Sequence, residues 1–132
     1  MSRVHGHGAP LVEHLHVTLS EPDWIRWRCT LSITKETPSF ALRRMLGDWI
    51  ECQLFENGCR GPRRVLTFGR YKQVHGLTTA YQKAALCAVA QAAGISNAHA
   101  LRMAIRMGCA QTLGPWQGYY GELERRTGEI SE

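Results

Sequence analysis

The sequence predicts a mainly α-helical fold with a short two-stranded antiparallel ribbon, built from two strand–helix–helix repeats in one chain. Three observations support this prediction. A run near the N-terminus alternates polar and apolar residues, four segments have helical character, and the order of these elements recurs about 59 residues further along. The 132 residues are enough for a compact domain that buries most of its apolar surface.

Residues 14–19, with the sequence His-Leu-His-Val-Thr-Leu, are the first predicted strand, and they follow a flexible arm at residues 1–13. The strict alternation has the period of a strand with one buried face. The leucines and the valine should therefore face the core. The outward side chains should be His14, His16 and Thr18.

Two helices should follow this strand and complete a repeat at residues 14–55. Residues 20–23, Ser-Glu-Pro-Asp, combine a hydroxyl N-cap, a proline in the first turn and acids at the positive end of the helix dipole, which predicts a helix over about 22–34. A break around Pro38 precedes a second helix that ends near Leu54. Its apolar residues repeat at the spacing of one helical face, at Leu42, Met45, Leu46, Trp49 and Ile50.

A connector rich in Gly and Arg at residues 56–71 precedes the second repeat at residues 72–113. The strand signal is weak here, whereas the helix signals are strong, with Gly94 as the end of one helix and Ser96 as the N-cap of the next. The expected elements are a strand at 73–77, or alternatively at 65–68, and helices at about 81–93 and 98–112, before a tail at 114–132.

The two repeats agree in residue character when the chain is shifted by about 59 positions. Residues 41–43, Ala-Leu-Arg, then align with the Ala-Leu-Arg at residues 100–102, and Thr37 aligns with Ser96. One strand with two amphipathic helices cannot bury its own apolar faces, so each repeat needs a second copy. We therefore expect an intramolecular pseudo-dimer in which the two strands pair and four helices form one core.

This order of elements resembles the ribbon-helix-helix family of DNA-binding proteins. The resemblance lies in a strand, a helix, a turn with a hydroxyl and a second helix that carries Ala-Leu-Arg, and residues 94–96 followed by 100–102 are the more typical copy. Two copies in one chain are similar in architecture to the TraY-type and VirC-type accessory proteins of plasmid conjugation and T-DNA transfer. The resemblance implies sequence-specific binding of double-stranded DNA, with the ribbon in the major groove.

A two-stranded ribbon fits the major groove of B-DNA, so its outward side chains would meet base edges. Depending on the register of the second strand, the expected base-reading residues are His14, His16, Thr18, Lys72, Gln73 and His75. The start of each second helix offers free backbone N–H groups and a positive dipole end to a phosphate. The expected phosphate contacts there, with the arginines on exposed positions, are Thr37, Ser39, Arg43, Arg44, Ser96, Asn97, Arg102 and Arg106. Helix capping by the hydroxyls and ordinary solvation of the arginines remain the alternatives.

The distribution of charge agrees with a nucleic-acid partner. The formal net charge is +5, and no Asp or Glu occurs between Asn57 and Gly121, where eight Lys and Arg residues lie. Such a basic stretch binds a polyanion with release of counterions, although a solvated basic face gives the same pattern.

Other functions are open at this point. We expect no catalytic activity, no cofactor and no metal, because the motifs of hydrolases, nucleotide-binding loops and zinc sites are absent, although His5, His7, His14 and His16 have spacings that could bind a metal weakly. Within DNA binding, a transcriptional repressor or antitoxin is the alternative to a transfer accessory factor that acts with a relaxase or other transfer proteins. A protein-interaction module without DNA binding is the third alternative.

The sequence also predicts where the chain resides and how its cysteines are placed. It has no run of about 20 apolar residues and no signal sequence, so we expect a cytoplasmic monomer without membrane contact, with higher assembly on DNA open. Cys29 and Cys87 fall within apolar helical patterns and should be buried.

Overall fold

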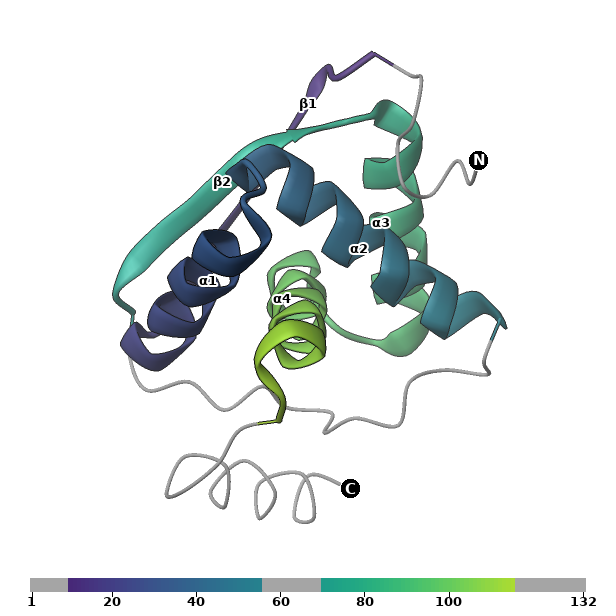
Figure 1. Ribbon diagram of the computed structural model, residues 1–132. Coiled ribbons are helices and arrows are strands. Elements are labelled where there is room, and N and C mark those ends of the chain that lie inside the picture. Colours follow the sequence, from purple (N-terminus) through teal and green to yellow (C-terminus); the bar gives the residue numbers. More distant parts are fainter. Residues whose placement is uncertain (1–9, 56–69, 116–132) are drawn as a thin grey trace, which may run out of the picture.

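The computed structural model describes residues 10–55 and 70–115, which form a two-stranded antiparallel sheet and four helices (Figure 1). The elements are β1 (Glu13–Leu19), α1 (Glu21–Thr34), α2 (Pro38–Phe55), β2 (Lys72–Thr78), α3 (Ala80–Ala93) and α4 (Asn97–Leu113). This confirms the mainly α-helical fold class with a short antiparallel ribbon. The expected boundaries lie within one residue of those observed. The alternative strand at 65–68 lies outside the described residues, as do residues 1–9 of the arm and the tail beyond residue 115.

The two strands pair along their whole length. His16 lies opposite His75 at the centre, and the paired ends are Glu13 with Thr78 and Leu19 with Lys72. Burial alternates along both strands, as a ribbon with one face on the core requires. The register left open by the sequence is therefore fixed, and the predicted inward and outward sides of the first strand are confirmed.

Hydroxyl caps begin the helices. The Ser20, Thr79 and Ser96 side chains each accept a hydrogen bond from a backbone N–H three residues further on, at the starts of α1, α3 and α4. Thr37 does the same for α2, with 3.3 Å between its Oγ1 and the Phe40 nitrogen. Gly94 ends α3 with φ of 74°, a left-handed conformation that favours glycine. These caps fix where each helix begins relative to the ribbon.

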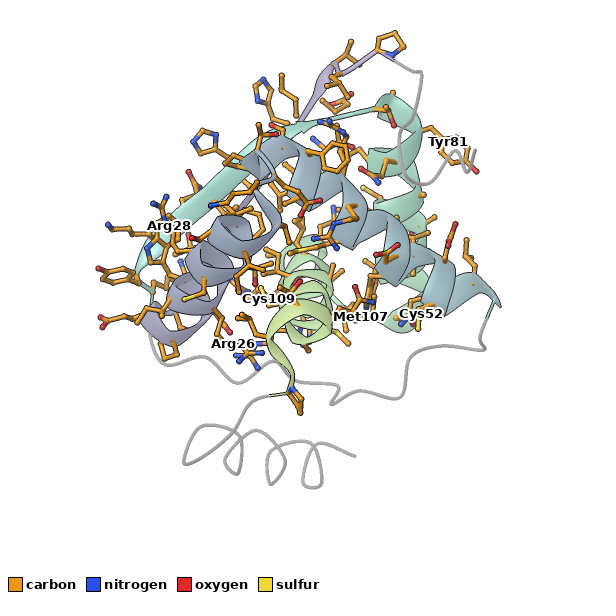
Figure 2. The ribbon with its side chains drawn as sticks, in the orientation of Figure 1. Arg26, Arg28, Cys52, Tyr81, Met107 and Cys109 are labelled. Atoms are coloured by element: carbon orange, nitrogen blue, oxygen red, sulfur yellow. The ribbon has the colours of Figure 1, made fainter. Side chains whose placement is uncertain are left out.

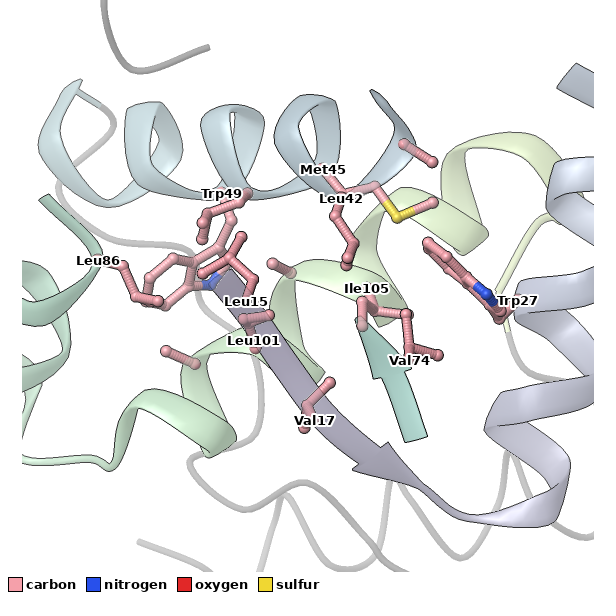
Figure 3. Close-up of a cluster of buried hydrophobic side chains, with 14 of the residues drawn as sticks. Leu15, Val17, Trp27, Leu42, Met45, Trp49, Val74, Leu86, Leu101 and Ile105 are labelled. Atoms are coloured by element: carbon pink, nitrogen blue, oxygen red, sulfur yellow. The ribbon is translucent and has the colours of Figure 1, made fainter. Parts of the chain in front are cut away.

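The core lies between the inner face of the ribbon and the helices (Figure 3). Both strands and all four helices contribute buried side chains, and α4 contacts β1 and each of the other helices. The labelled residues from these elements are Leu15, Val17, Trp27, Leu42, Met45, Trp49, Val74, Leu86, Leu101 and Ile105. One continuous core thus joins the first and second halves of the chain.

The expected burial of two cysteines is wrong. Cys29 on α1 and Cys87 on α3 are both exposed, whereas Cys109 on α4 is buried. Helix α1 carries apolar side chains on its outer face as well, since Ile25 and Ile33 are more than half exposed. An apolar pattern on both faces of a helix does not reveal which face is inward.

None of the described helices is long and apolar enough to cross a membrane by itself. Helices α3 and α4 reach the length and apolar composition of a membrane span only when they are taken together, and they are bent by 102° relative to each other. Much of α4 is buried inside the protein.

Candidate nucleic-acid interface

The outer face of the ribbon carries three cross-strand pairs of side chains. Because side chains alternate along a strand, the outward pairs are those at positions 14 and 77, 16 and 75, and 18 and 73. Five of these six side chains are exposed, and Thr18 is partly exposed. None of the six is acidic. The pairs are His14 with Leu77, His16 with His75, and Thr18 with Gln73.

Five of the six expected base-reading residues share this face, and Lys72 does not. Lys72 is the first residue of β2, and the alternation along the strand would turn it towards the core. Its side chain is nevertheless exposed. Its ammonium nitrogen lies 5.4 Å from the centre of the Trp24 ring and 5.3 Å from that of Tyr71. Lys72 therefore flanks the outer face of the ribbon. Leu77 completes the face, and the alternation from Gln73 would have indicated it once the register was known.

The hydroxyls at the starts of α2 and α4 have hydrogen-bond partners within the protein. Ser39, in the first turn of α2, accepts a hydrogen bond from the Leu77 backbone N–H at 3.0 Å. At the start of α4, the hydroxyl of Ser96 caps the helix, and the exposed Asn97 donates its side-chain N–H to the Cys87 sulfur at 3.2 Å. These hydroxyls thus have structural partners, and the contact of Ser39 places the start of α2 against the ribbon.

Arg43 and Arg102 each bind a backbone carbonyl of the ribbon. The Arg43 side chain donates to the Leu77 carbonyl, and that of Arg102 donates to the Thr18 carbonyl, each at 3.1 Å. Burial, with the charge of Arg70 as the next cause, lowers the pKa of Arg102. Both residues are partly exposed. They hold the strands to the helices and can still present N–H groups to an anion.

Arg44 is engaged with a carboxylate. It forms two hydrogen bonds to Glu36, at 2.6 and 2.7 Å, in the fork geometry that suits a carboxylate. The hydrogen bond from Arg44 is the main reason that the pKa of Glu36 is lowered. A phosphate would therefore compete with an internal partner at this position.

The expected exposure of Arg106 is wrong. Arg106 is 9% exposed, and its guanidinium forms a bidentate ion pair with the buried Asp23, with Nη2 2.9 Å from Oδ2. The Ser20 hydroxyl donates to the same carboxylate at 3.2 Å. The residue lies one turn after Arg102 and was assigned to the same surface. Its partner lies 83 positions away in sequence, so the local pattern could not reveal it.

The histidines of the ribbon do not form a metal centre with the residues that the structure describes. Within residues 10–55 and 70–115, no group of three or more His, Cys, Asp or Glu side chains is arranged to hold a metal ion. His5 and His7, the other two members of the His-rich pattern, lie outside the described residues.

Comparison with known proteins yields no relative. No protein-family model matches the chain, and no curated protein or solved structure gives a significant match. The resemblance to ribbon-helix-helix proteins gains no support from these comparisons, so the function has to be argued from the arrangement of the side chains.

The chemistry of this surface suits the edges of base pairs. Gln73 can form two hydrogen bonds to adenine, and the Thr18 methyl can contact the methyl of thymine. Imidazole groups, as at the His16–His75 pair, can donate or accept a hydrogen bond. This mostly polar face carries no acid, and Arg43 and Arg102 are bound to its strands, so it can read bases and approach phosphates together.

Proposed function

We propose that the protein binds double-stranded DNA in a sequence-specific way by inserting the β1–β2 ribbon into the major groove. The observation that carries this proposal is the outer face of the ribbon, with three cross-strand pairs that are exposed, mostly polar and free of acids. A ribbon of this kind fits the width of the groove. The positive charge in the second half of the chain adds an electrostatic attraction to any duplex, whatever its base sequence.

We infer further that the chain is an internal pseudo-dimer of two ribbon-helix-helix repeats. A shift of 59 positions carries the bounds of β1 and α1 onto those of β2 and α3, and the start of α2 onto that of α4. The same shift carries His16 onto His75, which is its partner in the ribbon. A two-fold axis through the centre of the ribbon would produce this pairing of equivalent residues.

Two hydrogen bonds support the same inference. A shift of 59 carries Arg43 onto Arg102, and it carries Thr18 onto Leu77. Each arginine donates to the strand carbonyl of the other half, so the two contacts are related as they would be across a two-fold interface.

The role that we propose is that of an accessory factor for plasmid or T-DNA transfer, which acts at an origin or enhancer site together with a relaxase or other transfer proteins. The two copies in a single chain favour this role over that of a repressor or antitoxin. A protein-interaction module is the second candidate, and the exposed Ile25 and Ile33 on α1 favour it.

Selection of bound fragments from the source replicon, followed by footprinting, tests the proposal. We expect one protected duplex segment, and a logarithm of affinity that falls linearly with the logarithm of salt concentration. An origin of transfer and a promoter would give different footprints and so would separate the two DNA-binding roles. No duplex binding at about 50 mM salt would contradict the proposal and favour the interaction module.

Gln73→Ala measures base reading by the ribbon. We expect it to weaken discrimination at one base pair by about 1–3 kcal/mol, while affinity for unrelated duplexes changes little. Gln91→Ala is the matched control, because Gln91 is an exposed glutamine on α3 and not a residue of the ribbon. Equal behaviour of the two variants in competition binding assays would exclude Gln73 from base contact.

A further inference from the structure

The two ends of the ribbon differ at positions that the shift of 59 makes equivalent. At one end, the Lys72 ammonium lies over the ring of Trp24. The equivalent positions at the other end hold Glu13 and Lys83, which form an ion pair with 3.5 Å between the carboxylate oxygen and the ammonium nitrogen. We call these the Lys72 end and the Glu13 end. An aromatic ring leaves the charge of a cation in place, whereas a carboxylate neutralises it.

Further cations gather at the Lys72 end. Arg28 on α1 lies with its guanidinium carbon 5.9 Å from the centre of the Trp24 ring. Arg102 binds the strand beside this end, and the charge of Arg70 acts on it. Within the described part of the chain, the acids in the first turn of α1 are the exposed Glu21 and the buried Asp23, and Asp23 is paired with Arg106.

The Glu13 end carries cations as well, but more of its cations than of those at the Lys72 end are paired with carboxylates. Lys83 is paired with Glu13, and Arg44 is paired with Glu36. Arg43 packs over Phe40 and donates to the ribbon, and the exposed Lys35 lies before α2. Arg28 and Tyr81, which are labelled in Figure 2, lie on opposite sides of the molecule, on α1 and α3 respectively.

The side chains on the outer face of the ribbon also differ between the two ends. Next to the Lys72 end it carries Thr18 opposite Gln73, two side chains that can form hydrogen bonds to bases. Next to the Glu13 end it carries His14 opposite Leu77, and a leucine offers only apolar contact. Charge and hydrogen-bonding capacity are therefore both greater towards the Lys72 end.

We propose that the protein binds an asymmetric duplex site in one fixed orientation, with the Lys72 end on the half-site that supplies most of the phosphate contacts and base hydrogen bonds. This inference rests on the DNA binding proposed above and adds a direction to it. Lys72 and Arg28 bind phosphates on the flank of this half-site, while the ion pair at the Glu13 end leaves the opposite flank weakly held.

Directed cleavage of the DNA tests the orientation. Glu21 and Ala80 are equivalent exposed residues at the starts of α1 and α3, next to the two ends of the ribbon. An iron chelate is attached to the new cysteine of Glu21→Cys or of Ala80→Cys. The parent chain is treated with the same chelate, which reacts with its own exposed cysteines, and the cuts that it makes are subtracted. On the selected duplex, we expect each variant to cut a single flank, the two flanks to be opposite, and inversion of the site to exchange them. Equal cuts at both flanks by each variant would overturn the orientation while DNA binding stands, whereas absence of binding to any duplex would overturn the proposed function itself.

A pair of charge variants tests which end binds the phosphates. We expect Lys72→Gln to reduce affinity for the selected duplex and to lower the slope of the salt dependence by about one. The control is the double variant Glu13→Gln with Lys83→Gln, which removes the opposing ion pair without a change in net charge, and we expect its affinity to stay within about twofold of the parent, since exposed pairs contribute little. The reverse order of effects would assign the strong half-site to the Glu13 end and overturn the proposal.

Discussion

Asp23 and Arg106 form a buried ion pair, which gives Arg106 a structural role. Both side chains are less than a tenth exposed, and the Ser20 hydroxyl adds a third hydrogen bond to the carboxylate. A buried charge that loses its partner is strongly destabilising, since neither water nor another side chain replaces the lost contact. Arg102, one turn earlier on α4, is partly exposed and binds a strand carbonyl.

Arg106→Ala should therefore act on stability, and Arg102→Ala should act on DNA affinity. We expect Arg106→Ala to reduce the free energy of unfolding by about 3–5 kcal/mol, because Asp23 is then buried without a cation. Urea unfolding followed by circular dichroism measures this change. Arg102→Ala should weaken specific and unrelated duplexes about equally in binding assays. An Arg106→Ala protein of normal stability that binds DNA poorly would restore Arg106 as a phosphate contact.

Residues of the candidate site were predictable where the signal is local. The alternation of residues 14–19 placed His14, His16 and Thr18 on the outer face, because a strand has the same period in any fold. Lys72 and Arg106 were misplaced, since their surroundings depend on Trp24 and Asp23 from a distant part of the chain. Packing partners of this kind are set by the tertiary fold.

At the scale of elements, the crossing of α2 and α4 joins the two halves through residues of unequal size. Met45 on α2 lies against Gly108 on α4, where an added Cβ would approach the Met45 sulfur to 2.7 Å. The shift of 59 makes Met45 equivalent to Ala104, and Trp49 equivalent to Gly108. At these two pairs of positions α2 carries the large side chain and α4 the small one, so the halves are complementary there and not interchangeable.

Gly108→Ala tests this complementarity. The added methyl group overlaps the Met45 side chain, and overpacking of a dense core reduces stability by about 1–3 kcal/mol. In a Met45→Ala background the space is already open, so the same substitution should have a much smaller effect. Free energies of unfolding for the parent, the two single variants and the double variant give the coupling. Additive effects would show that the two helices do not approach each other so closely.

The weak signal of the second strand has a cause at the same scale. Gly76 interrupts the apolar alternation of β2, and a Cβ there would lie 2.9 Å from the Cα of Ser39. The glycine allows the start of α2 to pack directly on the ribbon. A glycine that lets another backbone approach closely also weakens strand propensity. Residues 73–77 therefore predicted a strand less clearly than residues 14–19 did.

At the scale of the whole molecule, the two strands of the ribbon come from the two halves of one chain and pair with each other. The ribbon, the arginine contacts with the strands and the α2–α4 crossing all join residues of the first half to residues of the second half. The sequence predicted this pairing from a physical need, because neither half can cover its own apolar surface. It could not predict which large side chain would meet which small one.

Unfolding of the protein should therefore be unimolecular. When both halves of the ribbon belong to one chain, the midpoint of thermal or urea unfolding does not depend on protein concentration, whereas the midpoint of an obligate dimer rises with it. We expect constant midpoints over about a hundredfold range of concentration, together with the mass of one chain in analytical ultracentrifugation. The Gly108→Ala variant is measured in the same way. Because it changes the α2–α4 contact, it should lower the unfolding midpoint by the same amount at every protein concentration. A midpoint that rises with concentration would mean that the halves of two chains are exchanged, and the internal pseudo-dimer would then be wrong.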